Sequence, residues 1–460
     1  MKIKCLVIMA LVSIAAIAEQ SISLTDDMNL RVGAEIRTRY EGYTNSVPTP
    51  NASKNGRHAT EYLRTRTRVF GALDFGDDVT INLSLANRFH YVTTSPRKPN
   101  NDGASTWEFP DEVIIDAANI VFKNLFDSGI SLTIGRQNLF FGNGLLVSEG
   151  TPFDQGRTVY VDGLTAKYES DDFKSTLFVL YDRWKDGSVF INDRNRPLRS
   201  GNIFTAGLYN TFIINELLNI DLYYMYNDLD DKHPNIAERA YRADSSLSLH
   251  TIGMRLFGTV SSLLDYSVEG VTRYYLFNSA YQFGRDADGN HIKADMADIR
   301  LKYHIYDDSP LKPMLGVEFT HFSGDDRAAG DNRSWNPIMS QCPLWGEELL
   351  PIMLNGMWSN LNMVGTTFSC NPTEKCKVTL YATDYYADER DGFIGADSNT
   401  GGGRHVGLLA GLFVSYDFLK DFHFLKSLSG QAYLSHFMPG NYYDNGHDSN
   451  WFRLELTAKF

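Results

Sequence analysis

The sequence lacks the long apolar run that a membrane-spanning helix requires. After its first 18 residues, no stretch of the 460-residue chain approaches about 18 consecutive apolar residues. Cysteines number only four, and no CxxC or Cys/His spacing predicts a zinc site. The net charge is −13, which argues against nucleic acid as a partner. We therefore expect no helical anchor, no metal, no cofactor and no nucleic acid.

The first residues have the pattern of a secretory signal. Two lysines precede the apolar run 5–17, and Ala16-Ile17-Ala18 has the spacing of a cleavage site. A short transmembrane anchor is the alternative, but the run is too short to span comfortably and polar residues follow at once. We predict a signal peptide at 1–18 and a single domain at 19–460.

The last ten residues alternate strictly between apolar and charged or polar side chains. Phe452, Leu454, Leu456, Ala458 and Phe460 share one parity, and Arg453, Glu455, Thr457 and Lys459 share the other. This period of two predicts a strand with one apolar face. A soluble sandwich strand could look the same, but a strand ending on Phe460 is typical of outer-membrane barrels, whose assembly machinery reads that residue. An open edge cannot sit in lipid, so such a sheet must close on itself.

The same alternation recurs along the chain and predicts 18 strands. They lie roughly at 30–40, 60–75, 81–90, 112–125, 129–137, 157–169, 172–184, 200–213, 217–229, 246–260, 263–277, 292–306, 312–323, 358–370, 375–387, 404–418, 427–437 and 450–460. Short connections alternate with long ones, the long ones falling at 42–59, 94–111, 138–156, 185–199, 230–245, 278–291, 324–357, 388–403 and 438–449. Short periplasmic turns and long external loops are features of a bacterial outer-membrane barrel. We predict an all-β, transmembrane antiparallel barrel.

Charged side chains share one face of several predicted strands. Arg64, Arg66 and Arg68 form a ladder, and Arg37 and Arg39 on the preceding strand extend it sideways. Alternate residues lie ~6.5 Å apart, so the ladder offers successive sites for carboxylates. Alternatively, these arginines pair with acids such as Glu35, Glu41 or Glu61 and stiffen the wall.

Charge facing lipid near the membrane centre costs ~2–4 kcal/mol per Arg or Lys, so the charged faces should line a wet lumen. Thr251, Gly253 and Arg255 share one such face, as do Asp298, Arg300 and Lys302, and as do Asp265, Ser267, Glu269 and Arg273. The predicted pore-lining set is Arg37, Arg39, Arg64, Arg66, Arg68, Arg88, Arg136, Arg157, Arg255, Arg300 and Arg453.

Two motifs give the chain a family resemblance. The run Gly135-Arg136-Gln137-Asn138-Leu139-Phe140-Phe141-Gly142 is followed by Arg157-Thr158-Val159-Tyr160-Val161-Asp162-Gly163-Leu164. Together with the arginine ladder, they resemble the alginate-export family of outer-membrane barrels. The resemblance implies an 18-stranded monomer with an electropositive constriction, gated by an outside loop and a periplasmic turn. The family's functional arginines would correspond to Arg136, Arg157 and the ladder. Strict alternation places Arg136 on the same face as Ile134, so Arg136 must sit at a bulge or above the membrane to serve the lumen.

Other candidate sites are weaker. Cys370 and Cys376 flank a short turn and could form a disulfide, which leaves Cys342 over. The run Asp286–Asn290 has calcium-like oxygen spacing within a predicted long loop, but it lacks the downstream Glu, so a solvated turn is favoured. We interpret four histidines as surface residues: His233, His291, His405 and His447. Asp384 and Asp388 are interpreted as a solvated strand end, and the glycines 401–403 as part of a connecting loop.

These patterns predict a non-enzymatic channel that passes an anionic polysaccharide, such as an alginate-like polyuronate, or related anions. A porin importing acidic oligosaccharides or small organic anions is the first alternative, because the same arginines would serve it. A barrel enzyme and an adhesin or plugged barrel are further alternatives, but no nucleophile, His and acid converge on one spot. The expected partners are the anionic substrate, membrane lipid, the assembly machinery and periplasmic export proteins.

Overall fold

A computed structural model of the chain describes residues 20–44, 60–94, 107–108, 112–149, 160–186, 191, 201–230, 247–261, 272–305, 309–326, 330–337, 339–340, 358–392, 401–444 and 446–460. The predicted signal peptide, Arg157, Cys342, Asp265, Ser267, Glu269 and His233 lie outside these residues. Across the described parts, strands account for nearly all regular structure.

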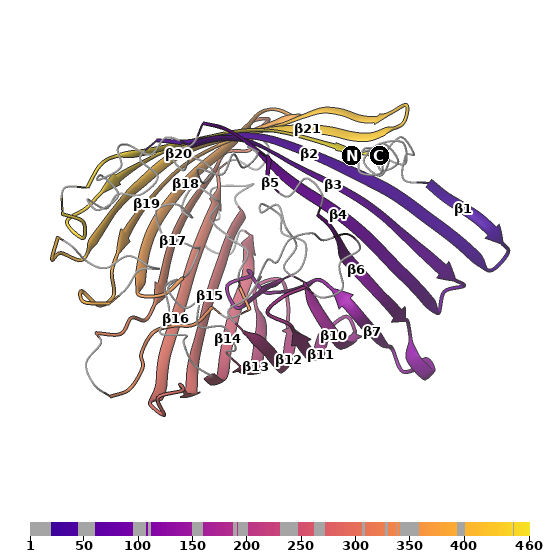
Figure 1. The fold of residues 1–460 in the computed structure, drawn as a ribbon, viewed down its shortest axis with the longest axis horizontal. Helices are drawn as coiled ribbons and strands as arrows, with labels where there is room; N and C mark the ends of the chain where they lie inside the picture. The colour runs from indigo at the N-terminus through magenta and orange to yellow at the C-terminus, as the bar shows by residue number, and fades with distance from the viewer. Residues whose placement is uncertain are drawn as a thin grey trace.

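Eighteen of the described strands form a closed antiparallel ring. In order they are β2 (Met28–Thr44), β3 (Thr60–Phe75), β4 (Val79–Thr94), β6 (Val113–Phe122), β7 (Ile130–Gln137), β10 (Val161–Glu169), β11 (Phe173–Asp182), β12 (Asn202–Ile213), β13 (Asn219–Asp230), β14 (Leu247–Ser261), β15 (Thr272–Arg285), β16 (His291–His304), β17 (Met314–Phe322), β18 (Leu361–Thr373), β19 (Cys376–Tyr386), β20 (His405–Phe422), β21 (Leu425–Pro439) and β22 (Ser449–Lys459). Each strand pairs with its neighbours in sequence, as Figure 1 shows. The predicted barrel and its strand number are confirmed.

The ring closes where the last strand meets the first. β22 pairs with β2 from Glu35 opposite Lys459 to Thr44 opposite Asn450. Just beyond, the Phe460 amide donates to the Ala34 carbonyl at 2.9 Å. A short strand, β1 (Gln20–Thr25), pairs with the start of β2 past the end of β22. These hydrogen bonds leave no open edge along the paired length of the seam, which is the condition for backbone in lipid.

The two faces of the wall differ as the alternation predicts. Large apolar side chains cover the outer face around the ring, among them Leu83, Leu177, Ile252, Leu301, Val364, Leu434 and Leu454, each at least half exposed. The opposite parity is buried and polar in the middle of many strands, as in Asp221, Thr251, Asn278, Asp298 and Thr320. An apolar outer band around a polar interior is the pattern of a transmembrane barrel.

The apolar core lies inside the ring. Leu249 on β14, Met296 on β16 and Phe322 on β17 face inward and pack with Leu145 and Trp335, which come from connecting segments. The segment after β7 carries a small hairpin, β8 (Leu139–Phe141) with β9 (Val147–Glu149). Its Ser148 amide donates to the Met339 carbonyl at 2.8 Å. Two connecting segments therefore fold back against the inner wall.

The predicted strand 263–277 is displaced. β15 runs from Thr272 to Arg285, and the predicted long loop 278–291 is mostly strand. A tight turn at Asp286–Asn290 follows, in which the Asn290 amide donates to the Asp286 side chain at 2.9 Å. β20 and β21 also extend beyond their predicted ends to a turn at His423–Phe424. Alternation continues through aromatic and polar residues alike, so pattern alone does not locate a strand's end. The short elements β5 (Trp107–Glu108) and η2 (Leu125–Asp127) complete the described structure.

Candidate functional site

Seven arginines gather on the inner face of four adjacent strands at the seam. We call them the basic wall: Arg37 and Arg39 on β2, Arg64, Arg66 and Arg68 on β3, Arg88 on β4 and Arg453 on β22. The register places Arg66 opposite both Arg37 and Arg88, and Arg39 opposite Arg64. Neighbouring strands lie only ~4.8 Å apart, so such rows of like charge require counter-charges.

Those counter-charges come from carboxylates on the same strands. Arg64 Nη2 donates to both Glu41 carboxylate oxygens at 2.7 Å, and Arg66 Nη2 donates to Glu35 at 2.6 Å. The Arg39 guanidinium pairs with Glu455 of β22. These side chains are almost wholly buried in the wall. The alternative that the arginines pair with Glu35 and Glu41 is therefore correct for Arg66 and Arg64.

Arg68 has a counter-ion that strand alternation does not predict. Ser84 of β4 pairs with Ala117 of β6, whereas Leu85 pairs with Ile115, so Asp116 is the extra residue of a β-bulge. The bulge turns Asp116 inward, where it accepts two hydrogen bonds from Arg68, at 2.6 and 2.9 Å. Bulges re-aim side chains in this way. Asp116 is fully buried, and sequence reasoning missed it.

The ion pairs of the described residues join the basic wall to several carboxylates. The carboxylates in these pairs are Glu35, Glu41, Asp116 and Glu455. Two of the arginines also contact ring side chains. Arg88 contacts His90 Nε2 at 2.6 Å, and Arg453 lies 4.1 Å from the Tyr433 ring centroid. The set is a cross-linked basic surface rather than a row of isolated cations.

Arg136 reaches the interior because the backbone changes direction before it. Gly135 has φ of +118°, a region that L side chains rarely adopt. A Cβ at this position would lie 2.4 Å from the Ala118 carbonyl. Arg136 is consequently buried although Ile134 is exposed. It donates to Asp162 at 2.9 Å and lies 3.5 Å from the Tyr160 ring centroid. The expected break in parity is present at Gly135.

A second group of charges lies halfway around the ring, on the inner face of β13 to β17. We call it the far cluster: Asp221, Arg255, Asp298, Arg300 and Glu318. Arg255 Nε donates to Asp221 at 2.6 Å, and Arg300 Nε donates to Asp298 at 3.0 Å. Tyr209 and Thr320 also donate to these two aspartates. In this cluster, acids and bases nearly balance.

The hairpin after β7 rests on the far cluster. Asn143 Nδ2 donates to Asp298 at 2.6 Å, and Phe141 stacks on Tyr209 with centroids 4.6 Å apart. Gly142 lies between them, and a Cβ there would meet the Tyr209 hydroxyl at 2.9 Å. The two glycines of the Gly135–Gly142 motif therefore each have a structural role. Gly135 turns Arg136 inward, and Gly142 lets the hairpin approach the wall.

Comparison with known families decides the assignment. A family model for alginate export matches residues 28–455. The chain belongs to the alginate-export family. Family and fold are those of outer-membrane channels, and the protein belongs to the bacterial outer membrane. No curated protein matches the chain.

Solved structures show the same barrel fold at low sequence identity. OccK11 (OpdR) of Pseudomonas aeruginosa is 11% identical with a TM-score of 0.57, covering 94% of this chain and 96% of its own. OccAB1 of Acinetobacter baumannii is 11% identical with a TM-score of 0.58, covering 96% and 99%. OpdK of P. aeruginosa, solved with vanillate, is 12% identical with a TM-score of 0.56, covering 93% and 98%. Within the described residues, none of the helices is long and apolar enough to cross a membrane.

The predicted disulfide of this alginate-export barrel is wrong. Cys370 and Cys376 are both free thiols in the hairpin of β18 and β19. Cys370 lies opposite Val378 and Cys376 opposite Thr373, so the two cysteines are offset along the hairpin. Diagonal neighbours lie ~7–8 Å apart between Cα atoms, beyond the usual reach of a disulfide.

The remaining sequence candidates fall into separate places. Arg255 and Arg300 belong to the far cluster, Arg453 belongs to the basic wall and Arg157 lies outside the described residues. Asp384 bonds His405 Nε2 at 2.7 Å on the outer face, and Asp388 accepts from the Gly324 amide, so these acids form no paired site. No described group of three or more His, Cys, Asp and Glu residues is placed to hold a metal.

Proposed function

We propose that this barrel conducts an anionic polysaccharide, of the alginate-like polyuronate class, along the basic wall. The observation that carries the proposal is the gathering of seven arginines on four adjacent strands, where the register sets Arg66 opposite both Arg37 and Arg88. A carboxylate that leaves water to enter a narrow pore loses hydration, and nearby guanidinium groups offset that cost. No energy source is part of this mechanism.

The ion pairs suit passage better than tight binding. An arginine already bonded to Glu41 or Glu35 has fewer donors left for a passing carboxylate. Conduction requires sites strong enough to admit an ion and weak enough to release it. The three arginines of β3 repeat at every second residue, so a polymer could exchange one partner for the next. We infer that the wall works as a series of weak sites.

The rest of the interior would guide the polymer toward this wall. The hairpin after β7 occupies space over the far cluster, where Asn143 bonds Asp298. The far cluster has nearly balanced charge, whereas the seam side is basic. A polyanion would therefore track the seam side of the pore, along β2, β3 and β22.

A porin for small organic anions is the second candidate. OpdK, solved with vanillate, has the same fold, and a narrowed basic lumen would admit single carboxylates. Both candidates use the same arginines, but they differ in the size of the permeant. A polymer occupies several sites at once, so its apparent affinity should rise steeply with chain length. A porin for small anions should show no such rise.

The test measures single channels of the purified full chain in a planar bilayer. The reversal potential under a salt gradient gives ion selectivity, and added polyuronates of two, six and twenty units give block. Anion selectivity with block that strengthens with length would support polysaccharide passage. Block by the dimer alone would favour the small-anion porin.

Neutral dextran of matched length is the control polymer, because it fills the pore without charge. Cation selectivity, or equal block by dextran and polyuronate, would contradict both candidates. The barrel itself would stand in either case, because the fold does not depend on the permeant.

A further inference from the structure

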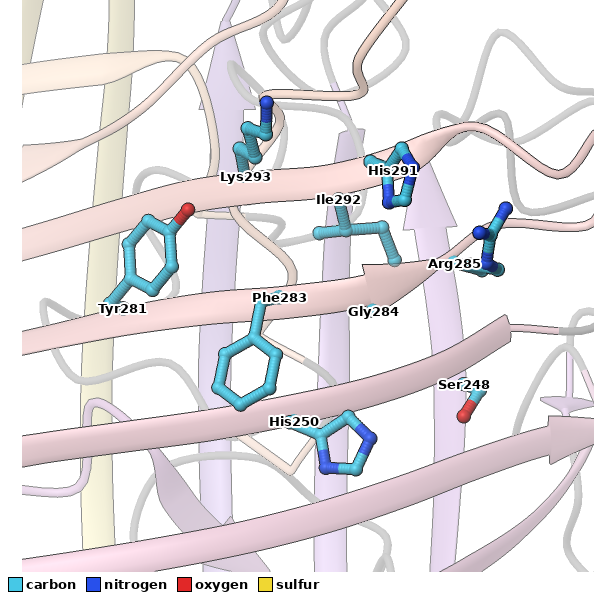
Figure 2. A pocket seen from close by; sticks show the side chains of 9 residues that line it. All are labelled: Ser248, His250, Tyr281, Phe283, Gly284, Arg285, His291, Ile292 and Lys293. Atoms are coloured by element: carbon cyan, nitrogen blue, oxygen red, sulfur yellow. The ribbon is translucent and has the colours of Figure 1, made fainter.

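A hollow of about 460 Å³ lies on the outer face of the barrel, away from the lumen. It is lined by residues of β14, β15 and β16, near the end of β15 at Arg285 (Figure 2). Tyr281 and Phe283 point outward and are each at least 40% exposed, whereas their neighbours Ala280 and Gln282 are buried in the wall. The turn Asp286–Asn290 closes β15 and β16 just beyond the hollow.

Aromatic rings form the floor of this hollow and continue sideways. His250 stacks on Phe283 with centroids 4.9 Å apart, and Tyr281 stacks on Phe283 at 6.3 Å. Tyr226 continues the row at 4.9 Å from His250. Below it the outer face is aliphatic, as at Ile252 and Ile299. Aromatic girdles mark the level of lipid headgroups in outer-membrane barrels. The hollow therefore lies where acyl chains give way to headgroups.

Cationic and titratable groups surround the rim. Figure 2 shows Arg285 and His291 beyond Phe283 along the strands, and Lys293 on the strand next to Phe283. Arg285 and Lys293 are exposed. Arg285 Nη1 donates to the Gly289 carbonyl at 2.9 Å, which holds the guanidinium at the rim. Its remaining donors suit a phosphate, which arginine can bind with two parallel hydrogen bonds.

Three acids near the rim, Asp331, Asp295 and Asp286, have partners of their own. Lys293 Nζ donates to Asp331 at 2.6 Å, and this bond holds the pKa of the Asp331 carboxyl below its ordinary value. Asp295 pairs with His321 at 3.3 Å, away from Arg285. Asp286 accepts hydrogen bonds from Asn290 within the turn. Lys293 is an exposed ammonium with three donors, so it can keep Asp331 and still contact a second anion.

We propose that this hollow binds the phosphorylated headgroup of a glycolipid in the outer leaflet. The aromatic floor would pack on the first methylenes and sugar rings, and Arg285, His291 and Lys293 would contact the phosphate. The apolar floor selects a lipid over dissolved phosphate, because a free anion gains nothing from aromatic rings. The site is separate from the pore, and it requires only that the barrel lies in an asymmetric outer membrane.

The test is retention of a bisphosphorylated lipid A-type glycolipid by the purified full chain in detergent, measured by native mass spectrometry. The same glycolipid without its phosphates and inorganic phosphate alone are the two comparison probes. Arg285→Ala with Lys293→Ala should weaken glycolipid retention by at least about tenfold, since two charge-assisted contacts are lost. Lys123→Ala with Lys174→Ala, which removes two exposed lysines at the other end of the barrel, is the matched control.

The retention measurements separate the outcomes that support glycolipid binding from those that overturn it. Retention of the bisphosphorylated glycolipid alone, lost in the Arg285/Lys293 variant and kept in the control, supports the proposal. Equal retention of the dephosphorylated glycolipid, or full competition by inorganic phosphate, overturns it. Folding is checked by electrophoresis of unheated samples. Arg285→Lys with Lys293→Arg keeps the charge and should retain the glycolipid, and its failure would also overturn the proposal.

Discussion

Replacing the three arginines of β3 offers the sharpest test of the basic wall. In the first variant Arg64, Arg66 and Arg68 all become Gln, which removes three positive charges from the wall. In the second variant Glu41→Gln, Glu35→Gln and Asp116→Asn are added, because these acids are the direct partners of the three arginines. The second variant removes three negative charges as well, so it restores the native net charge of the wall while the ladder itself is gone.

The expected size of the effect follows from Coulomb's law. A unit charge ~10 Å from the ion path in water contributes ~0.4 kcal/mol. Screening at 0.1 M salt, with a Debye length of ~10 Å, reduces this by about a factor of three. The loss of three charges then changes the electrostatic energy of an ion in the pore by ~0.4 kcal/mol. This energy corresponds to about twofold fewer anions and about twofold more cations in the pore. The anion-to-cation permeability ratio should fall about fourfold in the first variant.

The assay is the reversal potential of single channels under a tenfold KCl gradient, repeated at lower salt, where the effect should grow. The second variant should keep a ratio close to that of the native protein. A first variant with native selectivity would refute the idea that the wall's charge acts on the pore. A second variant that loses selectivity would show that the ladder acts through its geometry rather than through net charge. Electrophoresis of unheated samples checks that each barrel is folded.

Three further predictions concern stability and chemistry. Asp221→Asn should destabilise the barrel by ~3–5 kcal/mol, because it breaks a buried ion pair with Arg255. Asp331→Asn breaks an exposed ion pair with Lys293 and should change stability by less than ~1 kcal/mol. Urea titrations followed by tryptophan fluorescence compare the two variants, and similar unfolding midpoints would contradict the burial argument. Gly135→Ala should impair folding, because the added Cβ would meet the Ala118 carbonyl at 2.4 Å. At Gly76 an added Cβ would have no neighbour within 4 Å, so Gly76→Ala should cost only ~1 kcal/mol for its positive φ. Equal yields of folded barrel from the two variants would argue against the role of Gly135. Cys370 and Cys376 should both react with a maleimide without prior reduction, and peptide mapping that finds them linked would contradict the structure.

Strand parity was the most informative signal in the sequence. It located all eighteen barrel strands, at least by overlap. Parity works because lipid on one side and a polar interior on the other impose opposite requirements on alternate residues. It fails at strand ends, where both faces meet water, and β15 was therefore placed too early in the chain.

The partners of the arginines were only partly predictable. Glu35 and Glu41 lie on the strand next to the ladder, so their pairing with Arg66 and Arg64 could be considered from sequence alone. Asp116 could not, because it faces inward only through a one-residue bulge, and alternation assumes an unbroken ladder. Glu455 reaches Arg39 only because the ring closes, which joins residues more than 400 positions apart.

The sequence by itself determined the class of fold, the approximate strands and the strands that carry charge, because those properties depend on residues two positions apart. Only the tertiary structure decided which arginines share which acids, how Gly135 turns Arg136 inward and why Cys370 does not meet Cys376. These depend on register and closure, and a shift of one residue moves a side chain to the other face of the wall. The physical reason is that a barrel's interior forms from strands brought together by closure, whereas alternation records only which side each strand turns to lipid.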